Sequence, residues 1–428
     1  MRKSVVLVGT LDTKGDQLVY LKEQIERWGH RVVVVDMGVL GEPALQPTVD
    51  KHQVAAAVGT TIQELIALNG PALAMSKMAE GVAKVMKSLW DKREFDGVVG
   101  VGGSMGTSAA LAALKGVPLG VPKLLVTTMA YHRGVTPDMT GGLDVMMIPW
   151  TGGLWGLNSI SKEILEVAAG AISGAAQAYD RSRQFKKIVG VTSIGGSVAK
   201  YMDILKPALE QRGYEVAVFH AMGMSGRMYE RTIREGRVDA VLDLSAGVEL
   251  LNEVCDGVCS AGPDRLLSAG KMGIPQVVSP GAIEAFHWGH DRALPPAYQN
   301  RPRNWHNDIL LTMGSTVEEM GATGELLAKR LNESQGPAAV VIPMKGLGVK
   351  LPPPPPDAPV PDSSKEMEWK ALIRAQLQLT EPGLRTFKEE LTKHLKPEVK
   401  VVALDAGFND PAYVQTVLGL FDQMVIRR

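Results

Sequence analysis

Two short stretches in the first third of the chain carry groups suited to holding an anion. In the first, an apolar run at 98–101 leads through a glycine-rich turn into a run of good helix formers at 107–114. The turn consists of Gly102, Gly103, Ser104, Met105, Gly106 and Thr107. A strand, a glycine turn and a helix in this order direct backbone N–H groups and the positive end of the helix dipole at one point. This predicts a phosphate site, although a tight turn without a ligand fits equally, because the string matches neither GxGxxG nor GxxxxGK[ST].

The second stretch follows the first predicted strand, residues 4–8, and begins at Gly9. It places Thr10, Asp12 and Lys14 on one turn. A lysine there would neutralise phosphate charge, and an aspartate would hold Mg²⁺ through water. The alternative is a capped helix start, in which Asp12 or Thr13 accepts hydrogen bonds from backbone N–H groups. Thr127, at the end of a later predicted strand, is expected in the same site.

Alternating strands and helices must position these turns. Strands are predicted at 4–8, 31–36, 98–101, 121–127 and 144–148, and helices at 16–28, 72–91, 107–114 and 157–178. Such alternation is typical of a doubly wound α/β fold. Asp36 ends the second strand, where a dinucleotide fold places its ribose acid, but the first turn lacks the glycine trio, so NAD is not predicted. The polar loop 130–142 is either a lid or an ordinary surface loop.

A second set of α/β units begins after the charged stretch 179–187. Its strands are predicted at 188–192, 215–219, 240–244 and 338–343, and two of its helices at 364–378 and 382–395. We therefore expect two Rossmann-like subdomains with mainly parallel sheets, at 1–182 and 183–428, and a cleft between them. Candidate ligand contacts of the second subdomain follow its predicted strands or lie beside its glycine turns: Gly196, Ser225, Arg227, Gly262 and Arg265. For Arg265 the alternative is pairing with Asp264 within one helix.

Residues 285–307 are rich in His, Trp, Arg and Pro and too irregular for an ordinary connection. Glu284, His287 and His290 have a spacing that resembles metal ligands, but Gly289 would interrupt the helix that this spacing needs. Surface or core-edge histidines are the favoured interpretation, and the roles of His287, His290 and His306 stay open. Helical burial is expected for the two cysteines, Cys255 and Cys259.

Composition narrows the class of protein. The 428 residues include 46 Lys and Arg and 46 Asp and Glu, so the formal net charge is zero. The overall charge therefore gives no indication of binding to nucleic acid or to an acidic membrane. The chain shows neither a secretory apolar segment nor an apolar run of the ~20 residues that cross a bilayer. A cytoplasmic protein that acts without nucleic acid or membrane partners is expected.

Seven motifs keep their order along nearly the whole chain. They are GTLDTK (9–14), VGVGGSMGTS (99–108), GVPK (120–123), GLNSIS (156–161), SAGPDRL (260–266), QVVSPGA (276–282) and IPMKG (342–346). In these the chain resembles the tobamovirus resistance protein-like ATP-binding domain family. The resemblance implies two Rossmann-like subdomains, binding of ATP with Mg²⁺, which Asp12 would hold, and a homodimer. Plant members of that family inhibit viral replication proteins.

Three functions remain open from the sequence. The first is binding of Mg-ATP by the turns at 9–14 and 102–107. The second is an enzyme, a transferase, isomerase or hydrolase, that acts between the subdomains on a phosphorylated or acyl substrate. The third is a partner-binding protein in which nucleotide only stabilises the fold. Neutral charge does not separate them.

Overall fold

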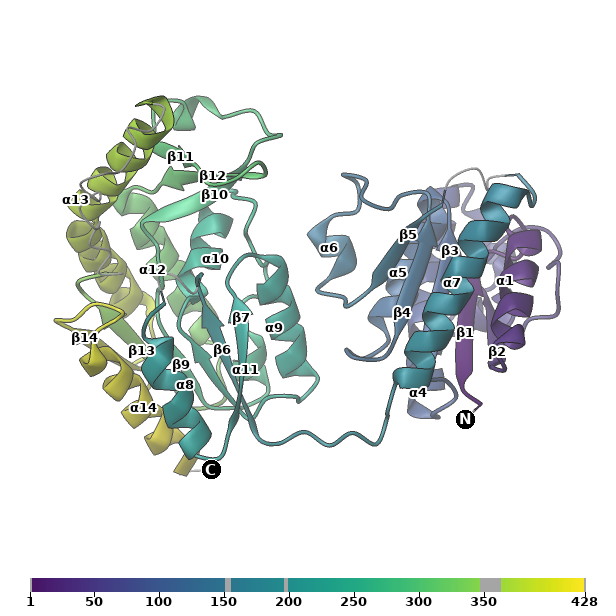
Figure 1. Cartoon of the computed structure of the whole chain (residues 1–428), viewed down its shortest axis with the longest axis horizontal. Helices are drawn as coiled ribbons and strands as arrows, with labels where there is room; N and C mark the ends of the chain where they lie inside the picture. Colours follow the sequence, from purple (N-terminus) through teal and green to yellow (C-terminus); the bar gives the residue numbers. More distant parts are fainter. Residues whose placement is uncertain (1, 151–154, 196–198, 347–362, 427–428) are drawn as a thin grey trace. The chain divides into compact units, whose positions relative to one another are not determined.

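A computed structural model of the chain describes residues 2–150, 155–195, 199–346 and 363–426. It divides into two compact units, Met1–Arg183 and Gln184–Arg428, and each is taken by itself below (Figure 1). The N-terminal unit holds the five-stranded sheet and its helices, and the C-terminal unit holds a six-stranded sheet and a smaller one of three strands.

The N-terminal sheet is parallel throughout and has the strand order β2-β1-β3-β4-β5. Its strands are β1 Ser4–Gly9, β2 Arg31–Asp36, β3 Gly97–Gly102, β4 Lys123–Thr127 and β5 Met146–Pro149. The order reverses between β1 and β3, which lie side by side at the centre. This is the doubly wound arrangement that the alternation of strands and helices predicts.

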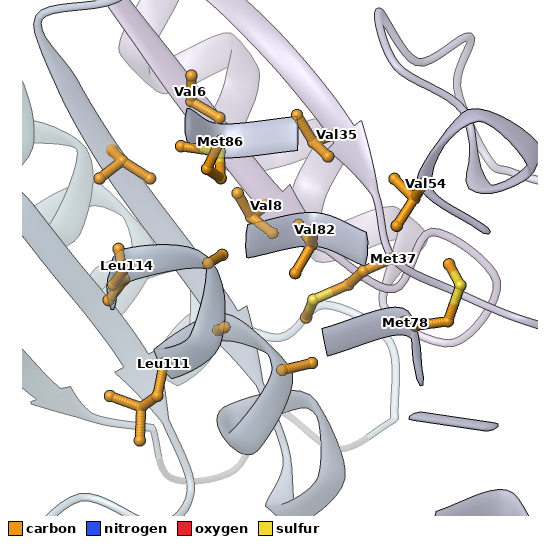
Figure 2. Close-up of a cluster of buried hydrophobic side chains, with 14 of the residues drawn as sticks. Val6, Val8, Val35, Met37, Val54, Met78, Val82, Met86, Leu111 and Leu114 are labelled. Atoms are coloured by element: carbon orange, nitrogen blue, oxygen red, sulfur yellow. The ribbon is translucent and has the colours of Figure 1, made fainter. Parts of the chain in front are cut away.

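Helices cover both faces of this sheet. On one face pack α1 Gly15–Arg27 and α7 Ser159–Ala178, and on the other α2 Lys51–Ala56, α3 Ile62–Ala67, α4 Pro71–Asp91 and α5 Ser104–Lys115. The short helix α6 Pro137–Thr140 lies in the loop between β4 and β5. Figure 2 shows the second face, where Met78, Val82 and Met86 of α4 and Leu111 and Leu114 of α5 meet the valines of the sheet.

The C-terminal sheet is also parallel, with the order β14-β13-β9-β8-β6-β7. Its strands are β6 Ile188–Ser193, β7 Glu215–His220, β8 Ala240–Asp243, β9 Gln276–Val278, β13 Ala338–Pro343 and β14 Lys400–Leu404. The order reverses between β6 and β8. Both units are therefore Rossmann-like, in agreement with the fold class expected from the sequence.

Helices α8 Met202–Gln211 and α14 Pro411–Ile426 cover one face of the C-terminal sheet. The other face carries α9 Met224–Arg234, α10 Ala246–Val254, α11 Ser268–Lys271, α12 Val317–Leu331 and α13 Ser363–His394. A 3₁₀ turn, η1 Pro296–Tyr298, precedes the last two strands of the small sheet. Among the described residues, no helix is both long and apolar enough to cross a membrane.

Two expectations about elements of the C-terminal unit are corrected. The stretch 285–307 is not irregular throughout, since β10 Ala285–Gly289 and β11 Arg303–Trp305 pair on either side of β12 Leu310–Gly314 in an antiparallel sheet. The helices expected at 364–378 and 382–395 are one helix, α13, which continues through Pro382. Helix α13 packs closely against α12. An added Cβ on Gly324 of α12 would lie 2.3 Å from the Phe387 carbonyl oxygen of α13, so the two helix backbones approach each other closely there.

Candidate functional site

A cavity of about 590 Å³ opens at the carboxyl ends of the N-terminal strands. Its lining comes from the turns after β1, β2, β3 and β4, together with the α3–α4 corner, residues 65–75. The cavity therefore lies at the reversal of strand order between β1 and β3, where open α/β sheets bind their ligands. Of the residues predicted for this site, seven line the cavity together: Thr10, Asp12, Lys14, Gly103, Ser104, Met105 and Gly106.

The turn after β3 presents the start of α5 to the cavity. Gly103 is the N-cap of this helix and makes no side-chain cap. The Thr107 N–H donates to the Gly103 carbonyl at 2.7 Å, so the intrahelical bonds begin there, after Ser104, Met105 and Gly106. The N–H groups of those three residues precede the first intrahelical bond and lie at the positive end of the helix dipole.

The glycines of this turn have different reasons to be glycine. A Cβ on Gly102 would lie 2.4 Å from the backbone carbon of Gly106, so only glycine lets the strand end this close to the helix. A Cβ on Gly103 would meet no atom within 4 Å. Since Gly103 has a φ of −78° and lines the cavity, a larger residue there fits the fold and projects into the space for a ligand.

The turn after β1 brings a lysine and a carboxylate to the same cavity. Lys14 is the N-cap of α1, which has no side-chain cap, and its Nζ lies 5.8 Å from the centroid of the Trp150 ring. Asp12 does not cap the helix. Its Oδ2 instead accepts a hydrogen bond of 2.9 Å from the backbone N–H of Leu40, in the turn after β2. Asp12 Oδ1 is buried and has no hydrogen-bond partner among the described residues.

Asp36 serves the backbone and not a ribose. Its Oδ1 accepts from the backbone N–H groups of Leu11 at 3.1 Å and Gly38 at 2.9 Å. The carboxyl is buried, and this burial raises its pKa. Asp36 therefore connects the turn after β1 to the turn after β2. These two hydrogen bonds help to hold Asp12 next to the backbone N–H of Leu40.

Four of the predicted residues do not line the cavity. A Cβ on Gly9 would meet the Leu18 side chain at 2.6 Å, and Gly102 packs on Gly106 as described above. Thr107 and Thr127 are buried, and their hydroxyl groups are hydrogen-bonded to each other. Thr127 Oγ1 also accepts from the backbone N–H of Met129 at 2.9 Å. We assign these residues to support of the turns after β3 and β4.

One wall of the cavity was not predicted from the sequence. Its apolar side chains come from the turn after β2 and from the α3–α4 corner: Val39, Leu40, Leu65, Ile66, Pro71, Ala74 and Met75. Leu40 and Ile66 are 61% and 51% exposed, and Met105 of the turn after β3 is 51% exposed. Within the described lining, the charged side chains are Asp12 and Lys14.

Arg265 of the C-terminal unit, expected to contact a ligand, is fully buried. Its guanidinium forms two parallel bonds to the Asp243 carboxylate, and its Nε donates to Glu249 Oε2 at 2.5 Å. A third carboxylate, that of Glu230, lies 3.2 Å from Arg265 Nη1. Burial raises the pKa of Glu249 to about 7. Arg265 is thus a structural cation, and Asp264, its expected partner, is exposed and lies 4.0 Å from Arg234.

The other candidates of this unit lie around one glycine turn or outside the described residues. Gly262 has a φ of +82°, and a Cβ there would lie 2.7 Å from the Arg227 guanidinium. Ser225 and Arg227 are half-buried near the start of α9. Gly196 lies outside the described residues. The structure thus places Arg227 against Gly262 and leaves both ligand assignments as predictions.

The rings of His287 and His306 come into contact at the small sheet, and His220 acts electrostatically on both. The rings of His287 and His306 meet edge to face with centroids 5.5 Å apart. Burial, His306 and His220 together lower the pKa of His287 to about 4. His290 instead lies against Trp305, with ring centroids 3.5 Å apart. Near this sheet, burial raises the pKa of Glu284 to about 7, and Glu284 Oε2 has no hydrogen-bond partner among the described residues.

These residues do not assemble the ligand set that their spacing resembles. Across the described part of the chain, one trio of His, Cys, Asp or Glu side chains has ligand atoms within 4.8 Å of one another: Glu325, Glu390 and His394. Lys329 already pairs with Glu325 at 2.6 Å, and Lys393 with Glu390 at 3.2 Å. Cys255 and Cys259 are free and buried, and burial raises the pKa of both thiols. Cys255 ends α10, whereas Cys259 lies in a loop and not in the helix expected for it.

Several known proteins are similar in sequence to this chain over nearly its whole length. A UPF0261 protein of Brucella melitensis biotype 1 is 35% identical over 422 residues, which cover 98% of this chain and 95% of that one. The tomato ToMV resistance protein Tm-1(GCR237) is 29% identical over 415 residues, 91% of this chain and 53% of the tomato protein. Among solved structures, a UDP-N-acetylglucosamine 2-epimerase from Rickettsia bellii matches 65% of this chain and 78% of its own at 12% identity and a TM-score of 0.22.

Two family models match in tandem. The model described as "Uncharacterised protein family (UPF0261) N-terminal domain" matches residues 3–181, and the model of the same family's C-terminal domain matches residues 186–353. Together with the Brucella relative, these matches show that the chain belongs to the uncharacterised protein family UPF0261.

Proposed function

We propose that the N-terminal unit binds the phosphate group of a small molecule in the cavity at the carboxyl ends of β1 and β3. The observation that carries the proposal is the convergence of two uncapped helix N-termini, those of α1 and α5, on one cavity. Backbone N–H groups and the two helix dipoles favour negative charge there. Lys14 adds the cation that a phosphate needs.

Mg-ATP is the first candidate ligand, and its support is the family resemblance. The donor set fits a magnesium ion: Asp12 Oδ1 is a buried carboxylate oxygen with no hydrogen-bond partner among the described residues, and hard cations take oxygen ligands of this kind. Asp12 would hold the ion directly or through water, and Mg²⁺ would neutralise phosphate charge. Lys14 and the N–H groups of the turn 102–107 would position the phosphates.

A phosphorylated or acyl substrate is the second candidate. The apolar wall formed by residues 65–75 and the exposed Leu40 favour a ligand with a sizeable apolar part. In this case the turn 102–107 would hold the anionic end of the substrate, and the reaction would depend on which substrate binds.

Calorimetric titration of the full chain with Mg-ATP and with inorganic phosphate tests the site. Gly103→Val should abolish binding of both, because its side chain occupies the ligand space without displacing protein atoms. Gly174→Val is the matched control, since a Cβ on Gly174 of α7 also meets no atom within 4 Å and this residue lies outside the cavity lining. Lys14→Ala should weaken binding roughly ten- to a hundred-fold. Unchanged affinity in both cavity variants, with the fold intact, would overturn the proposal.

A further inference from the structure

A second hollow adjoins the cavity, on the outer side of α4 and α5. It is a groove of about 290 Å³. Small side chains of α4, Ala72, Ser76 and Ala79, line it together with Ser108 and Ala112 of α5. The spacing of four and three residues places each set on one side of its helix. Leu111 of α5, one of the core residues in Figure 2, and Lys115 also line the groove, so the groove borders the hydrophobic core.

Two methionines belong to both the groove and the cavity. Met75 of α4 and Met105 of α5 line both hollows, and Met105 lies in the first helical turn after Gly103. Methionine side chains are unbranched and adapt their shape to a neighbour. A chain attached to a phosphate at the turn 102–107 would therefore pass beside Met105 and enter the groove.

Charge and apolar surface indicate which kind of ligand fits both hollows. The described cavity lining offers one cation, Lys14, beside the carboxylate of Asp12. Without a bound Mg²⁺, one cation is a small charge for a triphosphate, whereas it suits a single phosphate group. The groove has an apolar lining that includes Met75, Met105, Leu111 and Met139. Leu40 and Ile66 leave apolar surface exposed at the cavity. Covering them with an apolar ligand would remove that surface from water.

We infer that the ligand of the N-terminal unit is an amphipathic phosphoester, whose phosphate sits on the turn 102–107 and whose unbranched aliphatic chain lies in the groove between α4 and α5. The inference rests on the proposed phosphate site and adds the class of ligand. Met139 of α6 lines the groove, and the backbone carbonyl of its neighbour Asp138 accepts a hydrogen bond of 2.9 Å from Lys115 Nζ. The loop 130–142 thus borders the far end of the chain subsite.

A series of alkyl phosphates, from butyl to decyl phosphate, tests the inference by calorimetry on the full chain, with ATP as the competing ligand. Each methylene that becomes fully buried should raise the affinity roughly fourfold. Decyl phosphate should therefore bind at least about tenfold more tightly than butyl phosphate. Ser108→Trp and Ala72→Trp, at exposed positions of the groove, should remove this gain and leave the affinity for butyl phosphate unchanged.

Lys77→Trp adds the same side chain to α4 at an exposed position outside the groove lining and should keep the chain-length dependence. Equal affinities along the series, a preference for ATP over decyl phosphate, or wild-type behaviour of Ser108→Trp would each overturn the chain subsite while leaving the phosphate site standing. A different result would overturn the phosphate site itself: Gly103→Val would then bind every ligand of the series as tightly as wild type does.

Discussion

Asp12 holds the turn after β2 through its hydrogen bond to Leu40, in which the backbone N–H of Leu40 donates to Asp12 Oδ2 at 2.9 Å. The bond joins the two turns that form one side of the cavity. The other carboxylate oxygen is buried beside it without a partner among the described residues. One side chain thus has a structural acceptor and an oxygen available for a cation.

Asp12→Asn separates these two roles. The amide oxygen of asparagine can still accept from Leu40, but the negative charge is gone. We expect the stability of the variant to stay within about 0.5 kcal/mol of wild type, while the Mg²⁺ dependence of nucleotide binding disappears. Titration with ATP in the presence and absence of Mg²⁺ measures this.

Asp12→Ala is the companion variant, because it removes the bond to Leu40 as well. It should cost about 1 kcal/mol of unfolding free energy, the net value of one hydrogen bond. A Mg²⁺ dependence that survives in Asp12→Asn would show that the ion, if bound, is held elsewhere.

Arg265→Met should destabilise the C-terminal unit strongly. The change leaves Asp243, Glu249 and Glu230 buried without the guanidinium that balances them. Breaking a buried ion pair on one side costs about 3–5 kcal/mol. Urea unfolding followed by circular dichroism measures the loss. A variant as stable as wild type but impaired in ligand binding would restore the ligand role that the sequence suggested.

Glu284→Gln should stabilise the protein in alkaline solution. The folded-state pKa of Glu284, about 7, lies above its usual value of 4.5. The native state therefore binds the proton more tightly than the unfolded state does. The resulting stability is fully present below about pH 4.5 and is lost as the pH rises through 7. Glutamine stays neutral, so the variant should exceed wild type by up to about 3 kcal/mol at pH 8.

Melting temperatures of both proteins at pH 5 and pH 8 measure this difference, which should shrink toward pH 5. Glu389→Gln, at an exposed position of α13, is the control and should change the melting temperature little at either pH. A gain of equal size at both pH values would exclude ionisation of Glu284 as its cause.

His287→Gln should improve tolerance of acid. The pKa of His287 is lowered to about 4, first by burial and then by His306 and His220. For a group with a depressed pKa, the stability is present above the unfolded value of about 6.5 and is lost as the pH falls through 4. The variant should lose less stability than wild type between pH 7 and pH 4. Parallel curves for the two proteins would contradict the prediction.

Strands and turns of this chain were determined locally. The runs RVVVVD and AAVVIP predict β2 Arg31–Asp36 and β13 Ala338–Pro343 to the residue, because a strand buried on both faces is a short, continuous apolar run. The glycines of 102–107 likewise predict the turn into α5, since backbone conformation and helix propensity are properties of neighbouring residues. These signals suffice for the Rossmann-like class and for the position of the turn 102–107.

Only the tertiary structure decided what surrounds the turn and which charged residues it leaves accessible. The α3–α4 corner lies about thirty residues before Gly103, and its exposed Ile66, like the exposed Leu40 after β2, looks like an ordinary core residue in the sequence. Arg265 looks like a ligand residue, yet Asp243, Glu249 and Glu230 converge on it from β8, α10 and α9. Burial and charge pairing depend on chain segments distant in sequence, so no local pattern of residue types records them.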